Sequence, residues 1–195
     1  MAGARGPAHA GRGIEPERTR ANQSDPGGPV AVDTSIIGKP AGARRVHVER
    51  GPVEFFATAL KDDNPVYHDA AVAAGAGFAG IPAPPTYSFV MGHPGAWPDD
   101  QPPDPTGGSH PGFAIIGGLM REHGGLVLHG EQEFVYHRPI VAGDVLDGTS
   151  VIADVYEKEA KGSIMVFVVT ETLWRDAAGD PVVTERFNLI HRRKA

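Results

Sequence analysis

The stretch Ser-Ile-Met-Val-Phe-Val-Val-Thr-Glu-Thr-Leu-Trp, residues 163–174, decides the expected fold. β-branched and aromatic residues dominate it, which is typical of a β-strand. Its first half, Ile164 to Val169, is apolar at consecutive positions rather than at alternate ones. A strand that is apolar on both faces is buried on both faces, so we expect this stretch to lie at the centre of a sheet.

The sequence on both sides of this central stretch also predicts strands, because apolar and polar residues alternate there with a period of two. The three further strands are expected at 126–140, 144–156 and 181–191. The turns between the four strands are expected at 141–144, 161–162 and 176–180. Such short turns join antiparallel neighbours, so we predict a meander.

The part of the chain before residue 92 predicts one strand and three helices. Ile36 to Val48 contains short apolar runs that suit a first strand. Apolar residues recur at helical spacing in 52–60. A second short helix is expected after Asn64, which suits an N-cap, and a third over 86–91. Helices that precede a meander indicate an α+β fold in which the sheet wraps around a helix.

Two segments are rich in Gly and Pro. Residues 1–33 lack hydrophobic periodicity, so we predict a disordered arm there and a single folded domain over 34–195. Residues 92–112 consist almost wholly of turn-forming residues. A loop of that length within a compact domain is typical of a functional flap or an insertion.

The composition excludes several classes of protein. The net charge of -6 over 195 residues disfavours nucleic acid or an anionic membrane as a partner. The chain has no cysteine, which excludes disulfides and thiolate chemistry. It also lacks a run of apolar residues long enough to span a membrane, and its N-terminus does not resemble a signal peptide. We therefore expect a cytoplasmic protein.

One short motif places acid/base groups close together. In Asp62-Asp63-Asn64-Pro65-Val66-Tyr67-His68, two carboxylates and an imidazole lie within about two helical turns. The segment Ile81-Pro82-Ala83-Pro84-Pro85-Thr86 follows shortly afterwards and leads into the third expected helix. Asp62, Asp63 and Asn64 suit helix capping equally well, and His68 suits an exposed helical position. The residues alone leave both readings open.

These two motifs resemble the signature of the MaoC-like hydratases and dehydratases, in particular the FAS1-like dehydratase N-terminal branch to which mycobacterial HadA-type subunits belong. The resemblance covers about residues 45–192 and includes Pro139-Ile140-Val141-Ala142-Gly143-Asp144. It implies a hot-dog fold, an antiparallel sheet wrapped around a central helix. It also implies dimers whose sheets join edge to edge, as a homodimer or as a heterodimer with another MaoC-like chain.

The resemblance implies that the chain is a hydro-lyase of fatty acid metabolism. The substrate would be an acyl thioester of coenzyme A or acyl carrier protein, and no cofactor or metal is expected. Water would add reversibly across a trans-2-enoyl thioester to give a (3R)-hydroxyacyl product. Asp62 or Asp63 would orient and activate the water, and His68 would act as the base. Asn64, Tyr67, Pro85 and Thr86 would contact the substrate.

The chain departs from the family pattern Asp-x-Asn-Pro-aliphatic-His in two places. Aligned on Asn64-Pro65, the histidine position holds Tyr67. The glycine whose N–H would polarise the thioester aligns with Pro85, which has no N–H, so only the N–H of Thr86 could replace it.

These departures favour an alternative function, a non-catalytic acyl-binding subunit that completes the substrate tunnel of a partner chain. A hot-dog thioesterase is disfavoured, because residues 87–91 contain no carboxylate.

Overall fold

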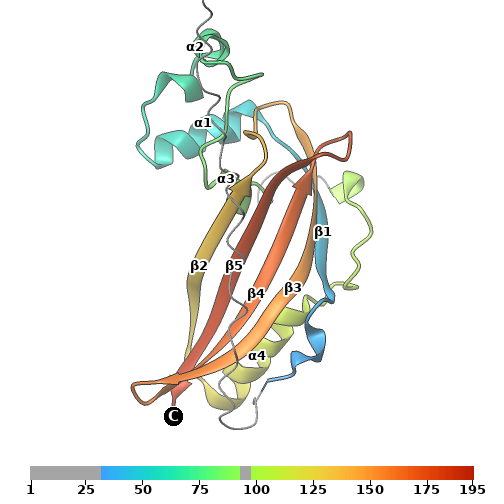
Figure 1. Cartoon of the computed structure of the whole chain (residues 1–195), viewed down its shortest axis with the longest axis vertical. Coiled ribbons are helices and arrows are strands. Elements are labelled where there is room, and N and C mark those ends of the chain that lie inside the picture. Colours follow the sequence, from blue (N-terminus) through green and yellow to red (C-terminus); the bar gives the residue numbers. More distant parts are fainter. Residues whose placement is uncertain (1–31, 93–97) are drawn as a thin grey trace, which may run out of the picture.

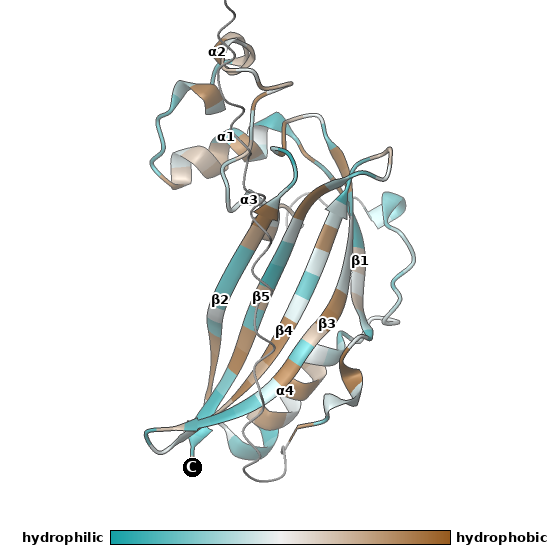
Figure 2. Cartoon of the chain, viewed as in Figure 1, coloured by the Kyte–Doolittle hydropathy of each residue, from teal (hydrophilic) through white to brown (hydrophobic). Residues whose placement is uncertain are grey.

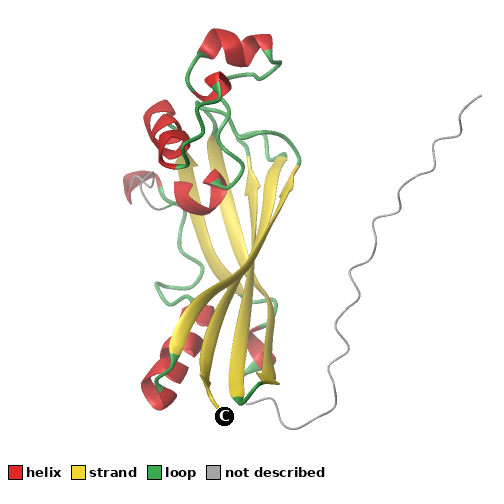
Figure 3. Cartoon of the chain, turned by 90° about the vertical axis from the view of Figure 1, so that its left-hand side faces the viewer, coloured by secondary structure: helices red, strands yellow, loops and turns green. Residues whose placement is uncertain are grey.

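The computed structural model describes residues 32–92 and 98–195. Five antiparallel strands form one twisted sheet in the order β1-β3-β4-β5-β2, and the helices lie at its two ends (Figures 1 and 3). The strands span β1 Pro40–His47, β2 Leu126–Tyr136, β3 Val145–Ala160, β4 Ser163–Arg175 and β5 Pro181–Lys194. The predicted disordered arm, residues 1–33, lies outside the described residues except for Val32 and Asp33.

The central position predicted for residues 163–174 is confirmed, because β4 pairs with β3 on one side and β5 on the other. The predicted meander is correct for β3, β4 and β5 but wrong for β2. That strand pairs with β5 instead, from Leu126 opposite Arg192 to Tyr136 opposite Val183.

β2 does not pair with β3 because the connection after Tyr136 is hydrogen-bonded to another part of the chain and does not form a tight turn. Within it, Val141 forms an antiparallel bridge with Pro82, and the N–H of Ala142 donates to the carbonyl of Ile81 at 2.8 Å.

The helical region between β1 and residue 92 contains α1 Arg50–Ala59, α2 Ala70–Gly75 and α3 Tyr87–Met91. The predicted helix after Asn64 is in fact two elements. Asn64 caps a 3₁₀ turn over Pro65–Tyr67 by accepting from the N–H of Val66. Asp69 then caps α2 by accepting from the N–H groups of Ala71 and Val72. The second cap ends the first element, because the N-cap residue itself is non-helical.

The sequence analysis missed the longest helix, α4 Pro111–His123. His110 caps it, because its Nδ1 accepts from the N–H of Gly112 at 3.1 Å and of Phe113 at 3.3 Å. Three glycines lower the helical propensity of this segment and concealed its apolar residues. Within residues 32–92 and 98–195, no helix is long and apolar enough to cross a membrane.

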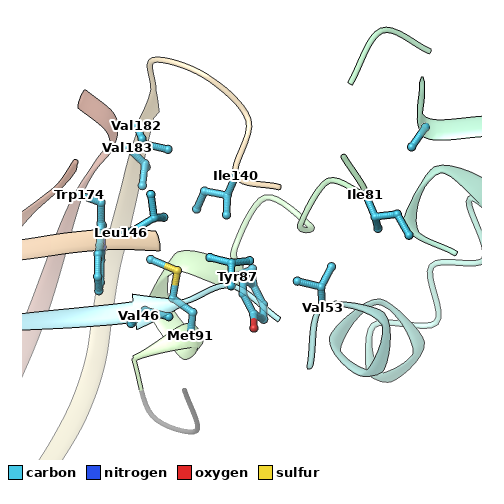
Figure 4. Packing of buried hydrophobic residues seen from close by; sticks show 12 residues of the cluster. Val46, Val53, Ile81, Tyr87, Met91, Ile140, Leu146, Trp174, Val182 and Val183 are labelled. Carbon is cyan, nitrogen blue, oxygen red and sulfur yellow. The ribbon is translucent and has the colours of Figure 1, made fainter. Parts of the chain in front are cut away.

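Two separate hydrophobic clusters hold the helices against the sheet. One joins α1, α2 and α3 to the upper ends of the strands, around Met91, Leu146 and Trp174 (Figure 4). The other joins α4 to the middle and lower parts of β3 and β4, around Ile116, Ile152 and Val166. Along the strands, hydrophobic and hydrophilic residues alternate (Figure 2), so that one face of the sheet serves both clusters.

The two edges of the sheet differ. At the β1 edge, the side chain of Gln101 accepts from the N–H of Arg45 at 3.0 Å and donates to its carbonyl at 2.9 Å. The amide thus pairs with β1 as a neighbouring strand would. In the described part of the chain, no strand pairs with the outer side of β2. Its exposed apolar residues include Leu126, Val127 and Val135.

Replacement of Gly112 by Ala should destabilise the fold, because the new Cβ would lie 2.8 Å from Cγ1 of Val168 on β4. We expect a loss of about 1–3 kcal/mol from such overpacking. Gly118→Ala in the same helix is the matched control, because nothing lies within 4 Å of its Cβ position. That variant should gain about 0.5–1 kcal/mol in helical propensity. Chemical denaturation measures both, and equal midpoints for the two variants would contradict this packing.

Candidate functional site

The loop between α1 and α2 carries the residues that the sequence singles out. A carboxylate oxygen of Asp62 accepts from the N–H of Asn64 at 3.1 Å, and the side-chain oxygen of Asn64 accepts from the N–H of Val66 at 3.2 Å. Both side chains therefore fix the local backbone, as the capping interpretation expects. Asp63 is exposed.

A pocket of about 490 Å³ lies beside this loop, and we call it the motif pocket. Three of the seven predicted site residues line it, namely Asn64, Tyr67 and Pro85. The other four, Asp62, Asp63, His68 and Thr86, are not part of its lining. Strand β2 and the connection that follows it supply the far wall, with Tyr136, His137, Arg138, Pro139 and Ile140.

His68 interacts with α1 rather than with the motif pocket. Its Nε2 lies 3.3 Å from the carbonyl oxygen of Asp62, and its Nδ1 lies 3.6 Å from a carboxylate oxygen of Glu54. Arg50 donates to the carbonyl of His68 at 2.9 Å. Adjacent residues of a 3₁₀ turn point about 120° apart, so Tyr67 and His68 cannot both face the pocket.

Tyr67 takes the place that the family pattern reserves for histidine. Burial raises the pKa of its hydroxyl, and the negative charge of Asp62 raises it further. The phenol therefore stays protonated at neutral pH and offers a hydrogen-bond donor rather than a base.

The residue before the N-cap of α3 is Pro85, which has no backbone N–H to donate to a thioester oxygen. The carbonyl of Pro85 accepts a hydrogen bond from the hydroxyl of Tyr136 on β2. Thr86 is exposed at the N-cap position of α3, where its side chain makes no capping hydrogen bond.

Tyr136 also connects the motif pocket to a buried polar cluster. Tyr136 pairs with Val183 of β5, so its side chain lies on the same face of the sheet as that of Glu185, two residues further along. Burial raises the pKa of its hydroxyl, Ser88 lowers it and Glu185 raises it. Ser88 Oγ donates to Oε2 of Glu185 at 2.8 Å within the protein interior. Ser88, Tyr136 and Glu185 thus form a polar wall on the α3 side of the sheet.

Glu185 is a buried acid, with only 8% of the residue exposed. Burial raises the pKa of its carboxyl, although Ser88, Trp174 and Arg44 oppose the shift. Trp174 Nε1 lies close enough to act on this pKa, yet it makes no hydrogen bond of ordinary geometry. A raised pKa keeps Glu185 protonated at higher pH than an exposed glutamate.

A second cavity, of about 240 Å³, lies between the two hydrophobic clusters. We call it the inner cavity. Ser88, Phe89 and Gly92 close it from the α3 side, and Gly112 and Phe113 close it from the α4 side. Its floor is the inward face of the sheet, with Gly148, Ser150, Val168, Thr170, Thr172, Trp174, Glu185, Phe187 and Leu189.

The sequence analysis did not select Ser88, Tyr136, Trp174 or Glu185. One signal for Glu185 was available, since it falls in the alternating row Val183, Glu185, Phe187 and Leu189 of the last strand. A carboxylate in an apolar row is either exposed or held by hydrogen-bonding partners in the interior. Among the residues that the structure describes, no group of three His, Asp or Glu side chains is arranged to hold a metal ion.

Comparisons with known proteins agree with this fold. A family model for the FAS1-like dehydratase domain region matches residues 35–185. A UPF0336 protein of Thermobifida fusca is 33% identical over 148 residues, which cover 76% of this chain and 85% of the relative. One of Streptomyces avermitilis is 34% identical over 164 residues, which cover 84% of this chain and 97% of the relative.

Solved structures of the same fold include the ChsH1-ChsH2 complex of Mycobacterium tuberculosis, with a TM-score of 0.62, 24% identity and coverage of 80% of this chain and 86% of that chain. The HadBC (3R)-hydroxyacyl-ACP dehydratase complex of the same organism gives a TM-score of 0.57 at 24% identity, with 82% of this chain and 99% of that chain covered. A MaoC-like dehydratase gives 0.57 at 25% identity, where 83% of this chain matches 43% of that chain.

The antiparallel sheet, with α3 and α4 packed against its inward face, is the hot-dog fold that the sequence predicted, and the chain belongs to the FAS1-like dehydratase family.

Proposed function

We propose that this chain is one subunit of an enoyl-thioester hydratase or (3R)-hydroxyacyl-thioester dehydratase. It would bind the acyl part of a coenzyme A or carrier-protein thioester, and a MaoC-like partner chain would supply the Asp/His pair. The observation that carries this proposal is the placement of Tyr67, rather than His68, in the motif pocket.

The chemistry supports a division of labour between two chains. Hydration needs a base for the attacking water and a donor for the developing enolate oxygen. The lining of the motif pocket contains no carboxylate. Its one imidazole, His137, lies 3.2 Å from Oγ1 of Thr184. Pro85 supplies no N–H where the family pattern has a donor. The pocket can therefore hold a thioester better than it can react with one.

The open edge of β2 supports a partner of the same fold. Exposed apolar strand edges are normally paired or covered. Val127 is 45% exposed on this edge, and Phe113 on α4 is 59% exposed. The ChsH1-ChsH2 and HadBC structures are complexes of more than one chain by name, which agrees with this proposal.

The purified chain alone should not hydrate crotonyl-CoA or a long-chain trans-2-enoyl-CoA. Activity should require a second MaoC-like chain with an intact Asp-x-Asn-Pro-x-His motif. The loss of the conjugated thioester absorbance measures both reactions. Turnover by the folded chain alone, at the rate of the complex, would overturn the division of labour.

A second candidate function is catalysis by this chain itself, with Asp62 or Asp63 activating water and His68 as the base. One observation favours it, since the loop brings Nε2 of His68 within 3.3 Å of the carbonyl of Asp62. Thr86 N–H would then be the oxyanion donor.

Substitutions in the active complex separate the two functions. If the partner supplies the chemistry, His68→Ala and Asp63→Asn in this chain should change kcat by less than about threefold. Loss of a catalytic base would instead lower kcat by about 10²–10⁴-fold. Replacement of the histidine in the partner's motif is the matched control and should abolish activity. A loss of a hundredfold or more for His68→Ala would favour the second function.

Substitution on the β2 edge should weaken the association of the two chains. Val127→Lys places a charge on this edge, where a partner strand would bury it, and the dissociation constant should rise at least tenfold. The control is Val151→Lys, because Val151 is 38% exposed but lies on the interior strand β3. Analytical ultracentrifugation measures both variants. Equal effects would show that the chains meet elsewhere.

A further inference from the structure

The hydrogen bonds at the start of α4 all depend on His110. Pro111, the first helical residue, has no N–H to satisfy. The next two N–H groups, of Gly112 and Phe113, donate to Nδ1 of the His110 side chain at 3.1 Å and 3.3 Å. The N–H of Ala114 donates to the carbonyl of His110 at 3.0 Å. One imidazole nitrogen therefore satisfies both donors that the helix itself leaves open.

These two side-chain bonds fix the protonation state of the His110 ring. A nitrogen that accepts a hydrogen bond carries no proton, so the proton of the neutral imidazole must lie on Nε2. Protonation of Nδ1 would turn the acceptor into a donor that faces two other donors. It would also place a positive charge at the N-terminus of a helix, where the macrodipole disfavours it. The cap therefore forms only while His110 is neutral.

The charged groups around His110 give little compensation for its protonation. Arg44 of β1 and Glu185 of β5 line the inner cavity together with His110. Burial lowers the pKa of His110 and the Arg44 cation lowers it further, which outweighs the opposing effects of a backbone hydrogen bond and of the Asp104 carboxylate. That carboxylate accepts from two N–H groups of its own turn at 2.8 Å. Glu185 gains a proton as the pH falls, so it then offers no counter-charge.

The first turn of α4 also closes the inner cavity. Gly112 and Phe113 line the cavity on this side, and the ring of Phe113 packs on that of His110 with centroids 4.6 Å apart. Gly112 lies so close to β4 that an added Cβ would come within 2.8 Å of Cγ1 of Val168. Loss of the cap would leave only packing to hold this turn over the cavity.

We propose that His110 is a pH-sensitive latch: protonation of its Nδ1 breaks both hydrogen bonds to the first turn of α4, and the freed turn opens the inner cavity on that side. The latch does not depend on the proposed function. It is closed above the ordinary pKa of histidine, about 6.5. Because the pKa of His110 is lowered in the folded state, the stability that the cap contributes is lost as the pH falls through that folded pKa.

Amide hydrogen exchange of the intact protein at about pH 7.5 and about pH 5, on either side of the ordinary histidine pKa, tests the latch. Protection factors compare each amide with an unstructured peptide at the same pH, which removes the intrinsic effect of pH on exchange. Those of Gly112 and Phe113 should fall about threefold to thirtyfold at the lower pH, as expected for the loss of an N-cap. Val168 in β4 is the reference for changes that affect the whole fold. Equal protection of the first turn at both pH values, relative to Val168, would overturn the proposal.

Variants at position 110 assign the effect to the imidazole. His110→Asn keeps a good N-cap without a titratable group, so the protection of the first turn should be the same at both pH values. His110→Ala removes the cap and should lower this protection at both. A full dependence on pH in His110→Asn would contradict the latch.

His123→Gln is the matched control for these variants. It removes the imidazole at the other end of α4, where Nε2 lies 3.6 Å from a carboxylate oxygen of Glu122. This variant should keep the dependence on pH of the wild-type protein, and loss of that dependence would show that His110 is not the group that titrates. The wild-type titration remains decisive if a variant does not fold.

Access to Trp174 tests whether the cavity opens. This residue lines the inner cavity and is 4% exposed, so acrylamide should quench its fluorescence weakly at the higher pH and more strongly at the lower. Trp97→Phe provides the background, because Trp97 is the second of the two tryptophans of the chain. His110→Asn in this background should keep the quenching weak at both pH values. If the first turn loses protection while the quenching of Trp174 stays the same, the opening of the cavity is overturned.

Discussion

The whole structure depends on covering the inward face of β4. This strand is central, so its inward residues have no contact with solvent at a sheet edge and must be covered by helices. Two short helices share this task instead of one long helix. α3 and the residues around it cover the end at Trp174, and α4 covers the end at Val166. The inner cavity lies where neither helix reaches.

The glycines set how closely these helices approach the sheet. Gly112 allows the first turn of α4 to rest on Val168, and the absence of a side chain at Gly148 leaves room for the ring of Trp174. Close contact at these two points holds the cavity open between them, because side chains on either side are already packed to van der Waals distance. The void is therefore a consequence of how the covering helix is divided.

The sequence predicted those features that local patterns determine. Residues 163–174 indicated the central strand, and the spacing within 52–60 indicated α1. The position of β2 depends on the long connection after it, which pairs with residues 81–83 and has no local signal. The sequence did not predict α4 because its three glycines lower the helical propensity of the segment. The close approach of this helix to the sheet, which a glycine permits, leaves no local pattern in the sequence.

The candidate site divides in the same way. The loop around Asn64 was found because its motif is continuous in sequence, but which of Tyr67 and His68 faces the pocket depends on one residue of helical phase. The polar wall was missed because Ser88, Tyr136 and Glu185 come from three separate elements. Glu185 lies beneath α3 only because its side chain points to the inward face of β5.

The buried carboxyl of Glu185 in this wall makes the stability of the fold depend on pH in one direction. Burial raises the pKa of Glu185 in the folded state above its ordinary value. A raised pKa means that its contribution to stability is complete below the unfolded pKa and falls as pH rises through the folded one. Ionisation would place a negative charge beside Phe187 and Leu189, and Arg44, which lines the same cavity, offsets only part of the cost of burying that charge. An aliphatic residue at position 185 would remove this dependence of stability on pH, because it has no proton to lose.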